Sequence, residues 1–519
     1  MKSFFKKEEQ AFQEIKKQFE NDGKLVYAGE LLKLAYEKYA DNIALIDPEK
    51  QITYREFYYR AVLFSKKIES CGIKKFDKVI IYSGNSIEYY IAYFAIWQIG
   101  AIVVPVNIFL HEKEFLYVVN NCSAKAIFVS DELKSKFDLL PKNEIPSINI
   151  VLTDLDIDWD SNVEKNIEFE VKTQESDQLS LILYTSGTTG KPKGVMLSSK
   201  NIMTNSLQDY VRLMSTNKRK NERFFSVLPL FHVFAQNTCM WLPVMTGSTM
   251  IIVKKIDRKL ILNGLKQKPT IFLGFPALFG LLCLLKTAPL DSIRMFISGA
   301  DAMSDKIRSA FGLVYGRKIC AGYGLTEAAP VIAVNHENET LATQYVGYPL
   351  IGVECDIRDD IGNSIPAGDI GTLWVKGDNV MMGYYQAPEE TEKVLKDGWL
   401  NTGDLGSINK DGYLAIKGRI KDLIIHKGFN IYPQEIENVL LSHPKVMQAA
   451  VIGKEDPDTG QIPVAFVASK ENVDNLESIL RDLCASNLAS YKIPKKIICL
   501  NELPMNATGK IDKKILQNY

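Results

Sequence analysis

The sequence is poor in the side chains that build metal centres and disulfide frameworks. It has five histidines and eight cysteines among 519 residues, with neither a Cys-x-x-Cys pair nor a His-Glu-x-x-His segment. Scattered cysteines without such spacing are typical of reduced, structural thiols. We therefore expect no disulfide framework and no transition metal held by the protein's own side chains.

The sequence also lacks a net charge and a long apolar start. Lysine and arginine together number 62, and so do aspartate and glutamate, which gives a net charge of zero at pH 7. A neutral chain has no excess of positive charge for nucleic acid, so we expect no such partner. Glu8 and Glu9 directly follow the basic first residues, which leaves no apolar core for a signal peptide and favours a cytoplasmic protein.

One apolar run approaches the length of a membrane span. It extends from Tyr89 to Val106, and Gln98 is its only clearly polar side chain. Gly100 and Pro105 interrupt the run. We therefore expect a buried helix through Gln98 followed by a core strand, and not a span.

Residues 1–25 predict an amphipathic N-terminal extension. Phe5, Phe12, Ile15 and Phe19 are spaced to share one helical face. Such a helix can dock on the protein or lie on a membrane, and the mixed charge signs of its polar face favour docking. A peripheral contact with the inner face of the membrane stays open as the alternative.

Residues 26–418 have the hydrophobic pattern of a large α/β domain. Short apolar strands alternate with helices, which is the pattern of a parallel, doubly wound sheet. The expected strands are 43–46, 78–82, 101–104, 126–129 and 179–184, and the expected helices are 54–70, 87–98 and 112–121. The polar residues 154–177 predict a surface connection.

Residues 419–519 predict a second, smaller α+β domain. Pro433 stands at the first position of a helix, Glu435 lies in its first turn, and Pro444 follows its end. The expected strands are 447–452, 464–468 and 496–500, and a further helix carries Leu476, Ile479, Leu480 and Leu483 on one face.

The segment from Tyr184 to Gly194 is the most distinctive motif. Its sequence, YTSGTTGKPKG, combines hydroxyls, glycines and two lysines between apolar runs, as a polyphosphate cradle requires. It is not a Walker A loop, because Thr185 replaces the first glycine and Pro192 follows Lys191. A plain Gly/Ser/Thr hairpin is the alternative interpretation.

Three further segments favour a nucleotide when they are considered together. The segment Gly322–Glu327 combines glycines, an aromatic ring, a hydroxyl and a carboxylate, although a turn is its alternative. Asp404 follows a tight turn and can accept ribose hydroxyls, unless it is only a turn or cap residue. Arg419 can bind the same ribose or form a surface ion pair.

These motifs, in this order, resemble those of the adenylate-forming superfamily. Its members include acyl-CoA synthetases, aryl-CoA ligases, firefly luciferase and peptide-synthetase adenylation domains. The likeness extends from about Val26 to the end of the chain. It implies a large AMP-binding domain with a small mobile domain after it, and it implies ATP, Mg²⁺ and CoA as the bound small molecules.

The resemblance also implies roles for single residues. Thr326 would contact the α-phosphate, and Thr185 and Glu327 would hold Mg²⁺. Asp404 and Arg419 would bind the ribose. The phosphates would lie against Thr185, Ser186, Gly187, Thr188, Thr189, Gly190 and Lys193, and the adenine beside Gly299, Ala300, Asp301, Gly322, Tyr323 and Gly324.

Two half-reactions are implied by the same resemblance. A substrate carboxylate attacks the α-phosphorus of ATP and releases pyrophosphate, and a thiol then attacks the acyl adenylate and releases AMP. Neither step needs an enzyme nucleophile. Lys510 would promote the first step, and Lys421 would be the hinge about which the small domain rotates. That rotation would bring Lys427, Gly428 and Phe429 to CoA.

The segment 228–235 points to the kind of acid. It resembles the part of fatty acyl-CoA synthetases whose histidine lies at the carboxylate end of the acyl site. His232 is therefore a candidate catalytic residue, with a core histidine as the alternative. The candidate acyl-binding residues are Phe231, His232, Val233, Phe234 and Gln236. Apolar neighbours and the run 272–285 favour an alkyl chain, so we expect a medium- or long-chain fatty acid.

Other acceptors and acids stay open as alternatives. Acyl carrier protein can replace CoA as the thiol, and an aromatic or succinylbenzoate-type acid can replace the fatty acid. Three places depart from the family pattern. Gln236 stands where some long-chain members have a tryptophan gate, Asp301 stands where proline is common, and residues 504–506 lack the basic residue often found before the Thr-Gly-Lys motif. The oligomeric state is not predicted by any of these motifs.

Overall fold

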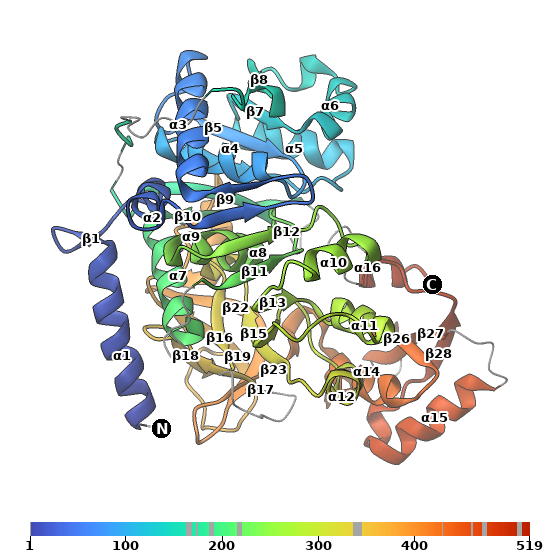
Figure 1. The fold of residues 1–519 in the computed structure, drawn as a ribbon. Coiled ribbons are helices and arrows are strands. Elements are labelled where there is room, and N and C mark those ends of the chain that lie inside the picture. Colours follow the sequence, from blue (N-terminus) through green and yellow to red (C-terminus); the bar gives the residue numbers. More distant parts are fainter. Residues whose placement is uncertain are drawn as a thin grey trace.

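The architecture of the chain comes from a computed structural model, in which helices pack on large sheets (Figure 1). The structure describes residues 2–161, 169–172, 175–185, 191–214, 221–335, 345–427, 429–457, 460–469, 475–505 and 511–519, without the side chains of 2–5 and 214. Within these residues, a seven-stranded, a 14-stranded and a five-stranded sheet organise the chain, beside a small ribbon of β1 (Glu20–Asn21) and β2 (Lys24–Leu25).

The seven-stranded sheet has a parallel centre and an antiparallel edge. Its strands follow the order β8 (Ile150–Leu152), β7 (Ala126–Val129), β5 (Lys78–Tyr82), β6 (Ile102–Pro105), β9 (Leu179–Thr185), β10 (Lys193–Ser198) and β20 (Gly383–Tyr384). Its helices are α3 (Tyr54–Ser70), α4 (Ile87–Gln98), α5 (Glu112–Cys122) and α6 (Asp131–Asp138). The doubly wound fold class is confirmed, and α3, α4, β5 and β7 have the predicted bounds.

Helix α4 accounts for the long apolar run. Eleven of its twelve residues are buried, all except Glu88, and the Ser86 side chain caps its start by accepting from the Tyr89 amide. Gln98 at its end accepts a hydrogen bond from the Ser65 hydroxyl at 2.9 Å. The expectation of a buried helix is confirmed, and none of the described helices is both long enough and apolar enough to cross a membrane.

The 14-stranded sheet joins a parallel half to an antiparallel half. Its parallel half contains β15 (Cys320–Gly324), β14 (Met295–Ser298), β13 (Ile271–Gly274), β11 (Arg223–Ser226), β12 (Thr249–Ile252) and β3 (Ile43–Ile46), with β4 (Gln51–Thr53) at the edge. Its antiparallel half contains β16 (Val331–Val334), β17 (Tyr345–Pro349), β23 (Leu414–Arg419), β22 (Trp399–Ile408), β19 (Gly371–Lys376) and β18 (Glu354–Arg358), with β21 (Leu395–Lys396) on β22.

The sheet membership of β3 differs from the sequence prediction. The alternation predicted that residues 43–46 begin the same sheet as β5, whereas β3 pairs in parallel with β12 of the 14-stranded sheet. The β3–β4 hairpin remains there because Tyr54, the first residue of α3, donates hydrogen bonds to the carbonyls of Ser248 and Pro243. Only α3 itself crosses to the seven-stranded sheet.

Three helices cover one face of the parallel half: α10 (Arg258–Leu265), α11 (Pro276–Leu285) and α12 (Asp305–Tyr315). They share one buried cluster with that sheet, in which Phe272, Phe279, Phe296 and Phe311 pack edge to face. The run 272–285, expected to favour an alkyl tunnel, therefore contributes much of its apolar surface to this core.

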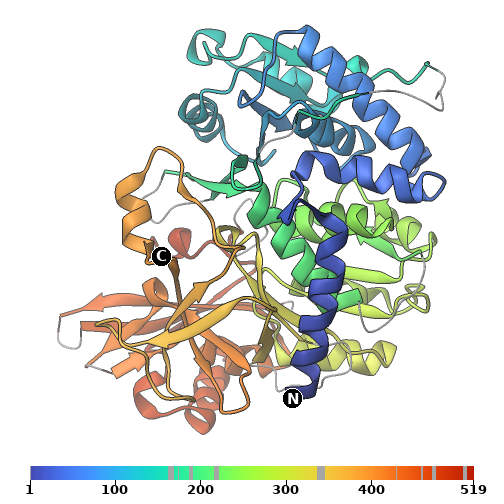
Figure 2. The ribbon, with the colours of Figure 1, turned by 90° about the vertical axis from the view of Figure 1, so that its left-hand side faces the viewer.

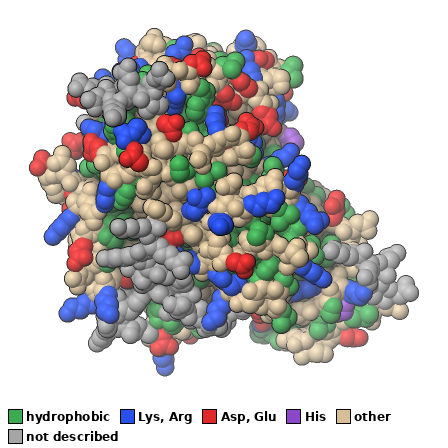
Figure 3. Space-filling model, in the orientation of Figure 1, with side chains coloured by type: hydrophobic (Ala, Val, Ile, Leu, Met, Phe, Trp, Pro, Cys, Tyr) green, Lys and Arg blue, Asp and Glu red, His purple; other side chains and the backbone are tan. Residues whose placement is uncertain are grey.

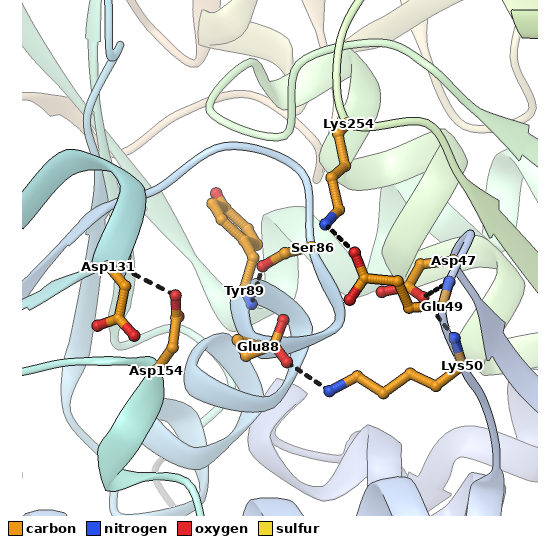
Figure 4. A network of polar contacts seen from close by, with 9 residues as sticks. All are labelled: Asp47, Glu49, Lys50, Ser86, Glu88, Tyr89, Asp131, Asp154 and Lys254. Carbon is orange, nitrogen blue, oxygen red and sulfur yellow. Dashed lines mark hydrogen bonds and ion pairs between the residues drawn. The ribbon is translucent and has the colours of Figure 1, made fainter. Parts of the chain in front are cut away.

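Charged contacts gather at the border of the two large sheets (Figure 4). Lys50, after β3, donates to Glu88 of α4 at 2.8 Å and so links the two sheets, whereas Lys254, after β12, pairs with Glu49 at 3.3 Å within the 14-stranded sheet. Burial raises the pKa of the nearby Asp154 carboxyl to about 6, although that carboxyl accepts from the Asp131 amide. On the upper part of the face in Figure 3, acidic and basic side chains are intermingled.

The five-stranded sheet belongs to the C-terminal part. It contains β25 (Phe429–Ile431), β24 (Ile424–His426), β27 (Gly460–Ser469), β26 (Val446–Asp456) and β28 (Lys496–Leu500). Its helices are α14 (Pro433–Ser442), α15 (Leu476–Asn487) and α16 (Lys513–Leu516). The side chain of Lys306 on α12 donates to three carbonyls after α14, of His443, Pro444 and Val446, so the two parts are joined directly.

Candidate active site

The phosphate-loop motif is carried by a hairpin at the edge of the seven-stranded sheet. β9 ends at Thr185, β10 begins at Lys193, and these two residues are paired across the hairpin. The predicted loop tip, Ser186, Gly187, Thr188, Thr189 and Gly190, lies outside the described residues. The described part brings Thr185 and Lys193 together at the base of the loop.

Lys193 has a partner that the sequence analysis missed. Its ammonium forms an ion pair with Glu390 of α13 (Pro388–Val394) and lies 5.1 Å from the centre of the Tyr384 ring. Lys193, and then Lys393, hold the pKa of Glu390 at about 2. A phosphate at the loop would compete with Glu390 for Lys193, because both ligands are anions.

Asp404, Tyr323 and Arg419 come from separate motifs and meet in the structure. Asp404 and Arg419 face each other across β22 and β23, with Oδ1 and Nε 3.4 Å apart. The Tyr323 hydroxyl on β15 donates to Asp404 Oδ2 at 2.5 Å. Burial, together with Asp404, raises the pKa of Tyr323, so this phenol stays a donor. Asp404 is only 7% exposed, whereas the Arg419 side chain is 55% exposed.

Thr326 and Glu327 begin a short 3-10 turn, η6 (Thr326–Ala328), directly after β15. The Tyr384 hydroxyl donates to Glu327 Oε1 at 2.9 Å. Burial raises the pKa of the Glu327 carboxyl, and the Tyr384 hydrogen bond and the positive charge of Arg419 oppose that rise. The predicted Mg²⁺ ligands are the Glu327 carboxylate and the Thr185 hydroxyl. Such a pair suits Mg²⁺, because this ion takes few protein ligands and completes its shell with water and phosphate oxygens.

Two glycines allow close approach of the backbone here. A Cβ on Gly324 would lie 2.1 Å from the Pro330 carbonyl oxygen, so no other residue fits without moving the chain. A Cβ on Gly299 would lie 3.0 Å from the Phe234 ring. The predicted adenine segment, which continues through Ala300 and the exposed Asp301, therefore touches the predicted acyl segment.

His232 precedes the short helix α8 (Val233–Gln236). It is half-buried, and its ring packs on Phe231 with ring centres 4.7 Å apart. Phe231 in turn contacts Phe109 edge-on at 6.2 Å. Aromatic surface therefore surrounds the outer side of this histidine.

Gln236 and Val233 lie in the core. Gln236 is fully buried, accepts a hydrogen bond from the Tyr93 hydroxyl at 2.9 Å and donates to the Leu230 carbonyl at 2.8 Å. Val233 is 6% exposed. Both the oxygen and the nitrogen of the Gln236 amide are thus hydrogen-bonded inside the protein. Gln236 therefore has a structural role, which its position four residues after His232 did not indicate.

Of the residues predicted in the C-terminal part, Lys421 lies close to Asp404 and Arg419. Lys421 is in the turn η7 (Ile420–Asp422), which follows Arg419, whereas Gly428 and Lys510 lie outside the described residues. Lys427 begins a turn next to Phe429, whose ring stacks on Tyr491 at 4.8 Å.

Lys513 connects α16 with the nucleotide side of the site. Burial by itself would lower the pKa of its ammonium, but the carboxylates of Glu437, Asp422 and Asp301 raise it overall. Its ammonium is 2.7 Å from Glu437. The end of the chain therefore lies beside the segment that follows β14.

The hairpin of the predicted phosphate loop, a carboxylate paired with arginine and tyrosine, and a small C-terminal α+β part together are the features of an adenylate-forming acid–thiol ligase. The chain belongs to the AMP-binding enzyme family, whose model matches residues 32–385. The model of the AMP-binding enzyme C-terminal domain matches residues 435–510.

Named relatives include ligases for different acids. The long-chain-fatty-acid–CoA ligase of Bacillus subtilis is 31% identical over 92% of each chain. The feruloyl-CoA synthase of an Amycolatopsis species is also 31% identical, over 89% of this chain and 92% of its own. Among solved structures, o-succinylbenzoate CoA synthetase of Bacillus subtilis with ATP and magnesium has a TM-score of 0.82 at 28% identity, covering 93% of this chain and 98% of its own.

Proposed function

We propose that this protein is an AMP-forming acyl-CoA ligase for a medium- or long-chain fatty acid. The observation that carries the proposal is the buried Asp404, which Tyr323 and Arg419 orient beside the motif that contains Thr326 and Glu327. A carboxylate fixed in this way can accept hydrogen bonds from both ribose hydroxyls. The solved relative that binds ATP and magnesium supports the same use of the site.

Positioning and charge compensation are the catalytic contributions of this chain. Lys193 would leave Glu390 to contact the phosphates, and Thr326 would donate to the α-phosphate. Glu327 with Thr185 would hold Mg²⁺, which neutralises charge on the phosphates when it is bound. Such fixed charges lower the barrier because they need no rearrangement during the reaction.

Besides Lys193 and Mg²⁺, Lys510 would bring a further positive charge to the phosphates. Lys513 follows Lys510 by three positions in the sequence, and the carboxylate of Asp301, in the predicted adenine segment, helps to raise the pKa of its ammonium. Rotation at Lys421 would then bring Lys427, Gly428 and Phe429 forward, so that a CoA thiol attacks the acyl carbonyl and AMP leaves.

The choice of acid rests on the surroundings of His232. Phe231, Phe234 and Phe109 give this region an aromatic, uncharged character suited to an alkyl chain. An aryl acid is the second candidate, because aromatic side chains also stack on aromatic rings and the feruloyl-CoA synthase is equally similar in sequence. Acyl carrier protein is the alternative acceptor.

A screen for AMP release tests the proposal directly. Purified protein with ATP and Mg²⁺ is offered fatty, aromatic and amino acids, each with CoA, with acyl carrier protein or with neither acceptor. We expect AMP and pyrophosphate with fatty acids of medium or long chain and CoA. Release of ADP and orthophosphate, or of AMP with aryl acids alone, would contradict it.

Lys510→Ala tests the assigned chemistry. We expect it to slow ATP–pyrophosphate exchange by at least about 10²-fold, the size of effect found when one donor to a developing negative charge is removed. Thioester formation from a supplied acyl adenylate should be much less affected. Near-normal exchange by the variant would show that Lys510 has no such role.

A further inference from the structure

The N-terminal helix α1 (Lys2–Lys16) lies outside the region that the family model matches, which begins at residue 32. It runs along the molecule and packs on α7 (Ser199–Met214), the helix that follows β10 (Figure 2). Phe12 and Ile15 contribute partly buried apolar surface to this packing. The sequence left docking and membrane contact open, and the structure shows a docked helix.

A buried ion pair fastens α1 to α7. Arg212 donates from Nε to Glu8 Oε1 at 2.6 Å and from Nη2 to Glu8 Oε2 at 3.1 Å, and their side chains are 2% and 6% exposed. This two-point geometry is the strongest form of the arginine–carboxylate contact. If one partner is removed, the other charge is left buried without its counter-charge.

Arg212 also contacts the sheet that carries the nucleotide site. Its guanidinium donates to the carbonyls of Val334 at 2.8 Å, Tyr348 at 3.2 Å and Pro349 at 3.0 Å. Val334 ends β16, and the other two residues end β17. One side chain therefore joins α1, α7 and two neighbouring strands.

The other end of β16 is held by the same helix. Asn205 of α7 accepts from the Val331 amide at 2.9 Å and donates to the Val331 carbonyl at 2.8 Å. Asn237 donates to Asn205 at 2.8 Å and so fixes the orientation of that amide. Helix α7 thus holds β16 at both its first and its last residue.

The active-site strand β15 depends on β16 for its position. In their antiparallel pairing, Gly322 lies opposite Val334, Tyr323 opposite Ala333 and Gly324 opposite Val331. Tyr323, the donor to Asp404, is therefore opposite Ala333, one of the two residues between the anchored ends. Thr326 and Glu327 follow within three residues of this pairing.

We propose that Glu8 and Arg212 are positioning residues for nucleotide binding, and that α1 is the element through which they act. This inference rests on the proposed function for the identity of the ligand. Glu8 fixes the guanidinium of Arg212, Arg212 fixes the end of β16, and β16 fixes Tyr323 and the turn with Glu327. Glu8 and Arg212 do not contact the nucleotide themselves. They act by holding in place Tyr323 and the turn with Glu327, which lie at the nucleotide site.

The test compares two neighbouring glutamates in the full chain. Glu8→Gln removes the buried charge, and Glu9→Gln, at an exposed position of the same helix, is the matched control. We expect Glu8→Gln to raise the KM for ATP in pyrophosphate exchange roughly tenfold, as for residues coupled to a site through packing. In Glu8→Gln, the KM for the acid should change less than about twofold. In Glu9→Gln, the KM values for ATP and for the acid should both change less than about twofold.

A second measurement does not depend on turnover. Hydrogen exchange of the backbone amides between residues 320 and 335 should be roughly tenfold faster in Glu8→Gln than in Glu9→Gln, with exchange in the C-terminal part unchanged. This readout separates the inference from the proposed function, because it holds whatever acid the enzyme uses. Glu8→Asp, which keeps the charge, replaces Glu8→Gln if that variant does not fold.

Two results would overturn the inference. One is equal amide exchange in the Glu8 and Glu9 variants, which would mean that α1 does not hold β15 and β16. The other is an equal rise of the KM values for ATP and for the acid, which would show a loss of overall stability instead of a nucleotide-specific effect.

Discussion

At the scale of single residues, α7 contains two buried ionisable side chains, one fully paired and one not. Arg212 donates at least five hydrogen bonds, to Glu8 and to backbone carbonyls. Asp209, one turn earlier, accepts from Asn237 at 3.0 Å through one oxygen, and its other oxygen has no hydrogen-bond partner among the described residues. Burial raises the pKa of Asp209 to about 8, although Arg212 and Asn237 oppose the rise.

This raised pKa predicts how stability depends on pH. The folded state keeps Asp209 protonated between its ordinary pKa near 4 and about 8, so its contribution to the free energy of unfolding declines as pH rises through that range. Asp209→Asn stays neutral, and we expect it to exceed the wild type by about 1–3 kcal/mol at pH 9 and to match it near pH 5. Urea unfolding at both pH values measures the difference, and a parallel pH profile of the two proteins would contradict the assignment.

The sequence predicted much of the site at this scale, because its motifs place suitable side chains at strand ends. Asp404 and Arg419, predicted as the ribose pair, lie side by side, and Tyr323, predicted to lie beside the adenine, donates to Asp404. Tyr384 and Glu390 were missed, since a tyrosine in an apolar segment and a glutamate in a charged helix have no distinctive spacing. Only the register of β20 on β10 shows that they approach Glu327 and Lys193.

At the scale of elements, the turn η7 joins the last strand of the large part to the first strand of the small part. Its backbone makes one local hydrogen bond, from the Leu423 amide to the Ile420 carbonyl at 3.2 Å. Burial lowers the pKa of the Lys421 ammonium, and Arg419 and Lys514 nearby lower it further. A segment with so few backbone bonds can change its dihedral angles at small cost.

Lys421→Pro should therefore separate the two half-reactions. Proline fixes one backbone dihedral and restricts the residue before it, which hinders rotation of the small part. We expect thioester formation to slow by about tenfold or more and pyrophosphate exchange by less than about threefold. Lys421→Ala, which removes the side chain without this restriction, is the control. Equal losses in both half-reactions would argue against a hinge.

The elements themselves were predictable where the hydrophobic period was clear. Helices α3 and α4 and strands β5, β7 and β28 have the predicted bounds. Membership of a sheet was less predictable, because pairing depends on distant contacts. The β3 strand joins β12 through the Tyr54 hydrogen bonds to residues almost 200 positions later, which no local pattern encodes.

At the scale of the whole molecule, Lys306 is a direct contact between the large and small parts. Its ammonium donates to three carbonyls of the small part, the shortest to Val446 at 2.7 Å, and burial lowers its pKa. Carbonyl partners of this kind stabilise one relative arrangement of the two parts. Their loss should make the parts separate more often.

Lys306→Gln tests that contact through proteolysis of the connection. We expect trypsin to cleave after Arg419 or Lys421 about fivefold faster in the variant, since loss of hydrogen bonds to a charged group at a partly exposed site is worth about 1 kcal/mol. Lys286→Gln, at an exposed position of the same face, is the control. Unchanged cleavage would mean that Lys306 does not restrain the small part.

The buried carboxylate near the start of the chain has a practical consequence for recombinant work. A shortened gene that begins at residue 32, the boundary of the family model, would delete Glu8. The guanidinium of Arg212 would then be buried without its counter-charge. An affinity tag fused ahead of Met1 would adjoin the helix that contains Glu8. Expression plasmids for this enzyme should keep every codon from the first and carry any tag behind a cleavable spacer.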